Sequence, residues 1–343
     1  MLLQLWPVSL VEALWPQLDA AVKVGQQLLA QARRTRDPDL LLEAHNSLGA
    51  VRFHRGELRL AREHLERGFA LYDPERHRAH ALLYGQDPGV VCLIRGAWTL
   101  WCLGYPQQAL ERSQQGIALA ERGAHPFSLA FALSYGAMVR LFRREPELAQ
   151  GTAAAGIAVS AEHGYPLFHG MSAYIQGWAM TEQGRLDDGI AQMRQGLTTF
   201  RATGAETGTP YFLAQLATLC AKAGRIDEAV ALDGEALAIL ARTSEGWFEA
   251  PVRLLHGETL LRCGAPEAEA ATSFRRAVVA ARRRHARSFE LQALLTLSRL
   301  HLDEDDEVEA LAGLVSTFAE GLDAPDLAEA HRLLHTGPST RLP

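Results

Sequence analysis

The stretch AWTLWCLGYPQQALERSQQG, residues 97 to 116, decides the fold, because its pattern of small residues returns along the chain. Residues 177 to 196, GWAMTEQGRLDDGIAQMRQG, have the same pattern two periods later. The equivalent turn residues lie 40 residues apart, at Gly104, Arg144, Gly184, Gly224 and Gly264. A fixed period of this length is typical of a solenoid built from stacked helical pairs.

Three columns of small residues recur from repeat to repeat. With the turn residue counted as the fifteenth of its repeat, the columns fall at positions eight, twenty and twenty-seven, as in Gly177, Gly189 and Gly196. A glycine within a helix costs about 1 kcal/mol relative to alanine, so a repeated column needs a packing reason. We therefore expect neighbouring helices to approach closely at these positions.

The turn residues also predict where helices end and begin. A turn glycine fits a left-handed C-cap of the first helix, and a proline two residues later fits the first turn of the second helix. These prolines are Pro106, Pro146 and Pro266. The glycines expected to close the second helices are Gly123, Gly164 and Gly204.

The period predicts an all-α chain of about seven helical pairs of 40 residues. We expect a partial N-terminal repeat over residues 1–37, the repeat array over 38–324, and a capping helix with a tail over 325–343. Eight extra residues precede Gly104 and one follows Gly264, so the array contains two insertions. No run of alternating apolar and polar residues competes with the helical pattern.

The small residue at position eight, the turn glycine and the alanine at position twenty resemble the tetratricopeptide repeat, although the period is longer than the usual 34 residues. Three stretches resemble, more narrowly, the C-terminal repeat region of large bacterial signalling ATPases: HALLYGQDPGVVCL at 80–93, WFEAPVRLLHGETLL at 247–261 and FAEGLDAPDLAEAHRLL at 318–334. This resemblance implies a right-handed α-α superhelix with a regulatory, protein-binding role. It also implies that a cyclase-like or DNA-binding domain and an ATPase domain lie upstream.

Sequence motifs argue against the common enzyme classes. The chain has two lysines, Lys23 and Lys222, and neither precedes Ser or Thr, so no Gly-Lys-Ser/Thr phosphate loop exists. No G-x-G-x-x-G, G-x-S-x-G or H-E-x-x-H pattern occurs either. We therefore expect no catalytic residue, no cofactor and no enzymatic activity.

The charge balance argues against nucleic-acid and membrane partners. A formal net charge of −6 does not favour general binding to polyanions. The apolar start, Met1 to Leu14, lacks the basic residues of a signal peptide and is too short to span a bilayer. Four cysteines without a C-x-x-C pair are expected to be reduced and mostly buried, as in a cytoplasmic protein.

Two histidine pairs could each place two imidazoles on one helical face. They are His77 with His80 and His331 with His335. Zinc usually takes four ligands and no cysteine stands near either pair, so we expect ordinary surface histidines and no metal site. The acidic run from Asp303 to Glu307 lacks the spacing of a calcium loop and is expected to precede a helix.

Aromatic residues give the best indication of a binding surface. In tetratricopeptide repeats, positions two, five, nine and twelve of the first helix line the concave groove. The candidate groove residues here are Trp98, Trp101, Tyr174, Trp178, Tyr211, Glu43 and Asn46. Exposed tryptophans at these positions would anchor a peptide or a partner helix. The alternative is that the aromatic side chains fill the space between adjacent helices.

The eight-residue insertion offers a second candidate, a docking loop that contains Tyr84 and Asp87. Because it interrupts the period, this loop could contact an upstream domain. A purely structural role is compatible with that: Gly85 would form a turn, Asp87 would cap the next helix and Pro88 would begin it.

Two functional hypotheses follow. The first is a noncatalytic helical-repeat module that binds a protein partner or an upstream domain and regulates a bacterial ATPase or cyclase-type signalling protein. The alternative is a sensor whose concave groove takes a small ligand or a short peptide and shifts the superhelix between open and closed forms.

Overall fold

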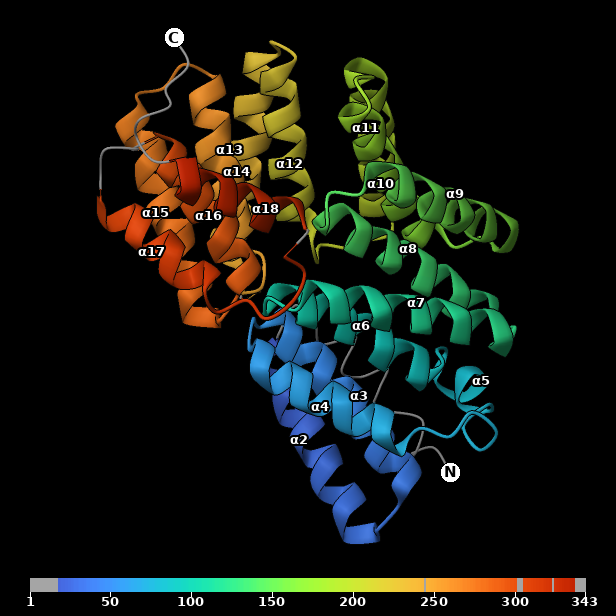
Figure 1. Cartoon of the computed structure of the whole chain (residues 1–343). Helices are drawn as coiled ribbons and strands as arrows, with labels where there is room; N and C mark the ends of the chain where they lie inside the picture. Colours follow the sequence, from blue (N-terminus) through green and yellow to red (C-terminus); the bar gives the residue numbers. More distant parts are fainter. Residues whose placement is uncertain (1–17, 244, 301–304, 323, 337–343) are drawn as a thin grey trace. The chain divides into compact units, whose positions relative to one another are not determined.

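The computed structural model describes residues 18–243, 245–300, 305–322 and 324–336 (Figure 1). These ranges contain 17 helices and no strand, which confirms the all-α prediction. The apolar start and the residues Asp303 and Glu304 lie outside the described residues. The acidic run nevertheless leads into a helix as expected, because α17 begins at Asp305.

The helices of the first half of the chain are α2 (Leu18–Thr35), α3 (Pro38–His54), α4 (Leu58–Leu71), α5 (His80–Tyr84), α6 (Pro88–Cys102), α7 (Pro106–Gly123), α8 (Pro126–Phe142), α9 (Pro146–His163) and α10 (Pro166–Glu182). The remaining helices are α11 (Leu186–Ala202), α12 (Thr209–Lys222), α13 (Ile226–Arg242), α14 (Glu249–Arg262), α15 (Glu267–Arg284), α16 (Arg287–Leu300), α17 (Asp305–Val315) and α18 (Pro325–Thr336). Apart from the short α5, they alternate as the first and second helices of the predicted repeats.

The chain divides into two compact units. Unit 1 comprises residues 1–100, 108–209 and 242–247, and unit 2 comprises residues 101–107, 210–241 and 248–343. Within unit 1, α3 packs on α4, α8 on α9, and α10 on both α9 and α11. Within unit 2, each helix from α14 to α18 packs on the next. Contacts between sequence neighbours are the defining property of a helical solenoid, so the predicted repeat architecture is confirmed.

The repeat turns have the left-handed backbone that the sequence predicts. The angle φ is +73° at Gly56, +87° at Gly184 and +75° at Gly224. Arg144 takes the same conformation with φ of +55°, although it carries a side chain. One prediction is off by a residue, because Gly123 is still helical and Ala124 is the left-handed residue after α7, with φ of +51°.

The prolines mark helix starts with one difference. Pro106 and Pro146 are the first residues of α7 and α9, as predicted. Pro266 lies one residue earlier relative to its helix and occupies the N-cap of α15, with ψ of 136°. The extended ψ explains this shift, because a residue in that conformation cannot belong to the helix that follows.

The small columns lie where two helices meet backbone to backbone. A Cβ added to Gly177 on α10 would lie 2.7 Å from the carbonyl oxygen of Gly189 and 2.7 Å from the amide nitrogen of Met193 on α11. A Cβ added to Gly196 would lie 2.5 Å from the amide nitrogen of Tyr174. These distances are shorter than carbon–oxygen and carbon–nitrogen contacts allow, so the predicted packing role is confirmed for this helix pair.

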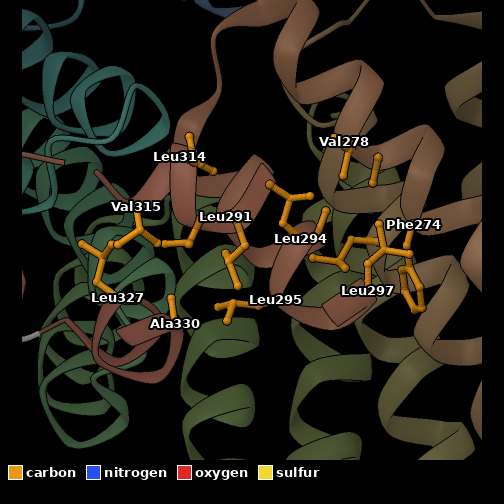
Figure 2. Close-up of a cluster of buried hydrophobic side chains, with 14 of the residues drawn as sticks. Phe274, Val278, Leu291, Leu294, Leu295, Leu297, Leu314, Val315, Leu327 and Ala330 are labelled. Atoms are coloured by element: carbon orange, nitrogen blue, oxygen red, sulfur yellow. The ribbon is translucent and has the colours of Figure 1, made fainter. Parts of the chain in front are cut away.

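The hydrophobic core of unit 2 joins α14 to α18 (Figure 2). Phe274 from α15 is fully buried there, and α16 contributes a row of leucines that includes Leu291 and Leu294. The predicted closing helix is present as α18, which inserts Leu327 and Ala330 into this core. Its apolar face therefore packs on α16 and α17, and its role as the cap of the array stays a prediction.

Candidate functional site

Unit 1 contains a buried aromatic cluster on its first helices. Phe53 at the end of α3, Trp98 on α6 and Phe142 at the end of α8 surround Trp247, which follows α13 in the sequence. The Trp247 ring lies 5.2 Å from Phe53 and 5.5 Å from Trp98, measured between centroids. Such spacings are those of favourable aromatic pairs, so these rings fix the position of the Trp247 side chain.

Polar groups beside this cluster hold the same segment. The Nδ1 of His54 lies 3.1 Å from Oε1 of Glu245, and the backbone amide of Gly246 donates to the carbonyl oxygen of His54 at 2.8 Å. On the other side of the ring, a guanidinium nitrogen of Arg95 lies 3.1 Å from Nε2 of His54. Because arginine can only donate, Nε2 accepts and Nδ1 carries the hydrogen that it donates to Glu245.

These polar groups are buried, and their burial favours the neutral imidazole. His54 is 2% exposed, Arg95 4% and Glu245 8%. Burial lowers the pKa of His54, and the nearby Glu245 carboxylate only partly opposes this shift. A neutral His54 between a donor and an acceptor orients both partners, since its two nitrogens then have opposite hydrogen-bonding roles.

We name the site formed by Phe53, His54, Arg95 and Trp98 the inner face. The local sequence explains how each of these side chains reaches it. Phe53 and His54 occupy the last turn of α3, and Arg95 and Trp98 lie one turn apart on α6. The indole of Trp98 donates to the carbonyl oxygen of Tyr135 on α8 at 2.8 Å, which fixes its ring. The inner face can therefore bind an extended segment through an aromatic side chain, a carboxylate and one backbone amide.

The predicted groove residues are all buried. Their exposed fractions are Trp98 5%, Trp101 3%, Tyr174 0%, Trp178 6%, Tyr211 6%, Glu43 2% and Asn46 5%. The expected exposure of the tryptophans is therefore absent, and the alternative, in which these side chains fill the space between helices, describes their surroundings. A role in binding a partner stays a prediction for all seven.

The structure brings only some of these residues together. Trp98 is part of the inner face in unit 1, whereas Trp101 belongs to unit 2 and packs edge-on against Phe289 at 5.0 Å. Tyr211 also belongs to unit 2, where its hydroxyl accepts from Gln215 at 3.4 Å. Glu43 accepts a hydrogen bond from Asn46 and contacts His80 of α5, so the inserted segment covers this part of α3.

The docking loop has the structural role that the sequence offered as one alternative. Gly85 closes α5 with φ of +81°, and an oxygen of Asp87 accepts from the amide of Val90 at 3.0 Å in the first turn of α6. The second carboxylate oxygen of Asp87 accepts from the hydroxyl of Tyr72 at 2.9 Å. Asp87 is 8% exposed and Tyr84 is half-buried, and their contact with an upstream domain stays a prediction.

Sequence reasoning missed His54, Arg95, Glu245 and Trp247. His54 and Arg95 lie beside predicted groove positions on first helices. A histidine and an arginine within otherwise apolar helices could have indicated a buried polar site. Glu245 and Trp247 lie between two repeats, and the period says nothing about where such a connection points. Their partners in α3 are about 190 residues away in sequence, as the 191-residue separation of His54 and Glu245 shows.

Other expectations have clear outcomes. Three cysteines are buried and Cys263 is partly exposed, which agrees with the expected burial. None of the described helices is both long enough and apolar enough to cross a membrane. The histidine pair His77 and His80 is not on the surface, since these residues are 2% and 6% exposed. That prediction was wrong because carboxylates from α3 cover both rings.

Comparisons with known proteins establish the fold. The chain matches no protein-family model. It is 26% identical over 261 residues to an uncharacterized protein of Rhizobium meliloti (strain 1021), which corresponds to 76% of this chain and 25% of that protein. The matched region thus spans a quarter of the relative's length.

Two solved structures have a similar helical arrangement. A Rap protein complexed with competence and sporulation factor aligns over 93% of this chain and 80% of its own, with a TM-score of 0.62 and 12% identity. The Rap conjugation gene regulator of plasmid pLS20, in complex with the Phr* peptide, aligns over 93% of both chains with a TM-score of 0.52 and 13% identity. At these identities the similarity establishes a helical-repeat fold.

Proposed function

We propose that this chain is a noncatalytic interaction module that binds an extended segment of a partner protein on the inner face of unit 1. The observation that carries this proposal is the set of contacts that residues 245–247 make with the inner face. The Glu245 carboxylate contacts the imidazole of His54, and the backbone amide of Gly246 donates to the carbonyl oxygen of His54. The indole of Trp247 packs against Phe53 and Trp98.

The chemistry of the inner face defines the partner. Arg95 donates to Nε2 of His54, so Nδ1 of His54 carries a hydrogen and favours an acceptor such as a carboxylate, as Glu245 shows. The aromatic walls select a large flat side chain two positions later. We infer a partner segment with an acidic residue followed by an aromatic one, held in extended conformation by its backbone.

The structural neighbours support a peptide ligand. Both Rap proteins described above were solved with a bound factor or peptide, as their descriptions state. In this chain, residues 245–247 occupy the inner face, so a partner must displace them. The same exchange gives the sensor alternative its mechanism, because a short peptide that releases this segment changes the conformation of the connection after α13.

The regulatory part of the proposal concerns a longer protein. The resemblance to signalling ATPases implies upstream domains, and the chain corresponds to only 25% of its relative in Rhizobium meliloti. Leu82 and Leu83 on α5 are 82% and 54% exposed, next to the predicted docking residue Tyr84. We propose that an upstream domain covers this apolar pair and that segment binding on the inner face is communicated to it.

A synthetic peptide tests the proposed binding site. The peptide RTSEGWFEA copies residues 242–250. Added at about ten times its Kd to the Trp247→Ala chain, it should raise the melting temperature by about 2–4 °C. The matched controls are the same peptide with Ala in place of Trp, and the Trp98→Ala/Trp247→Ala chain. Equal stabilisation by both peptides, or stabilisation of the double variant, would show that the inner face does not recognise this segment.

A further inference from the structure

The inserted segment before α6 brings a second cluster of polar side chains together. The possible ligand atoms of Asp39, His77 and His80 all lie within 4.8 Å of one another. Asp39 stands in the first turn of α3, whereas His77 precedes α5 and His80 begins it. The Nε2 atom of His77 lies 3.1 Å from Oδ1 of Asp39, and the two imidazole centroids are 4.8 Å apart.

Each histidine ring is held through its Nδ1 atom, and Nε2 of His77 faces Asp39. Nδ1 of His77 lies 2.9 Å from both the amide nitrogen and the carbonyl oxygen of Asp73, and it must donate to that oxygen when Nε2 binds an ion. Nδ1 of His80 lies 2.7 Å from Oε1 of Glu43. Histidines that bind metals commonly donate their second nitrogen to a backbone carbonyl or a carboxylate in this way, because the contact fixes the tautomer and the ring orientation.

We propose that Asp39, His77 and His80 form a zinc site that fastens the inserted segment to α3, with Glu43 as a positioning residue for His80. The ion is bound by Nε2 of each imidazole and by the Asp39 carboxylate. Two imidazoles with one carboxylate favour zinc over magnesium or calcium, which prefer oxygen ligands alone. Glu43 is 2% exposed and touches the site through His80 rather than directly.

The surroundings allow a fourth ligand and an entrance. His77 and His80 are buried, but the Asp39 side chain is 38% exposed, so water can complete a tetrahedral site from that side. Arg76 donates to the same Asp39 oxygen at 2.7 Å and is the competing cation. Because the Arg76 side chain is 51% exposed, it can turn into solvent when an ion binds.

Zinc and cobalt titrations of the whole chain test this site. After removal of metals with a chelator, we expect calorimetry to show one zinc ion per chain and Co²⁺ to give the visible absorption of a four-coordinate ion. Asp39→Asn and His80→Gln should abolish saturable binding, and Glu43→Gln should weaken it about 10- to 100-fold. The His331→Gln/His335→Gln chain, which lacks the other histidine pair, is the matched control and should bind as the unaltered chain does.

A second readout does not depend on the folding of any variant. Arg76 and Arg78 have side chains 51% and 76% exposed, so trypsin can cleave after either residue. Zinc should slow this cleavage at least several-fold in the unaltered chain, and a chelator should restore it. The proposal is overturned if the unaltered chain binds no zinc stoichiometrically, if Asp39→Asn and His80→Gln bind it undiminished, or if the His331→Gln/His335→Gln chain alone loses binding.

Discussion

Gly177→Ala tests the packing principle of the repeats most sharply. The added Cβ would lie 2.7 Å from two backbone atoms of α11, so one helix must move. Overpacking of this kind costs about 1–3 kcal/mol. Alanine is favoured over glycine within a helix by about 1 kcal/mol, so the free energy of unfolding should fall by about 0–2 kcal/mol in total.

A matched control separates packing from propensity. Gly151 lies in α9 of the same unit, and a Cβ added there meets nothing within 4 Å. Gly151→Ala should therefore stabilise the chain by about 1 kcal/mol. The two variants should differ by about 1–3 kcal/mol in free energy of unfolding. Gly177→Leu should be at least as destabilising as Gly177→Ala, since its side chain is larger.

Urea unfolding followed by circular dichroism provides the assay. The three variants and the unaltered chain are compared at one pH and one protein concentration. If Gly177→Ala and Gly151→Ala shift the midpoint equally and in the same direction, the column at position eight is not a packing column. The explanation given for the repeated small residues would then fail.

Three further predictions concern single groups. Asp87→Ala should lose about 1–2 kcal/mol of stability by urea unfolding, because the cap on α6 and the Tyr72 contact disappear, whereas Asp87→Asn should lose less. Burial lowers the pKa of both His45 and His64 to about 4 from 6.5, so the unfolded chain takes up protons first and stability is lost as pH falls below about 7. Urea midpoints of a His45→Gln/His64→Gln chain should therefore depend less on pH than those of the unaltered chain. In the native chain a thiol reagent should modify Cys263 rapidly and the three buried cysteines only after denaturation; rapid modification of all four would contradict the burial described here.

The repeat architecture was predictable from the sequence because each repeat carries its own signals. The left-handed turn at Gly184 and the proline that begins α9 depend on local backbone preferences, which a single stretch of sequence contains. The glycine columns could be read as close contacts for the same reason. Errors of one residue, as at Gly123 and Pro266, reflect caps that neighbouring packing decides.

The candidate site was much less predictable. Trp98 was identified from its repeat position, but one of the rings that pack on it is Trp247, which lies about 150 residues later in a connection outside the period. The histidine pair was judged from its own spacing, while the carboxylates beside it come from α3. Helical periodicity describes one element at a time, and both sites are formed by segments that meet only in the folded chain.

Competition between the chain's own segment and an added peptide tests the central claim most directly. A fluorescently labelled RTSEGWFEA peptide is titrated with the Trp247→Ala chain and with the unaltered chain. In the unaltered chain residues 245–247 act at an effective concentration of about 1 mM, so a peptide with a Kd of about 0.1 mM for Trp247→Ala should bind the unaltered chain about tenfold more weakly. Equal affinity for both chains, or no binding to either, would contradict the proposal that the inner face is a segment-binding site.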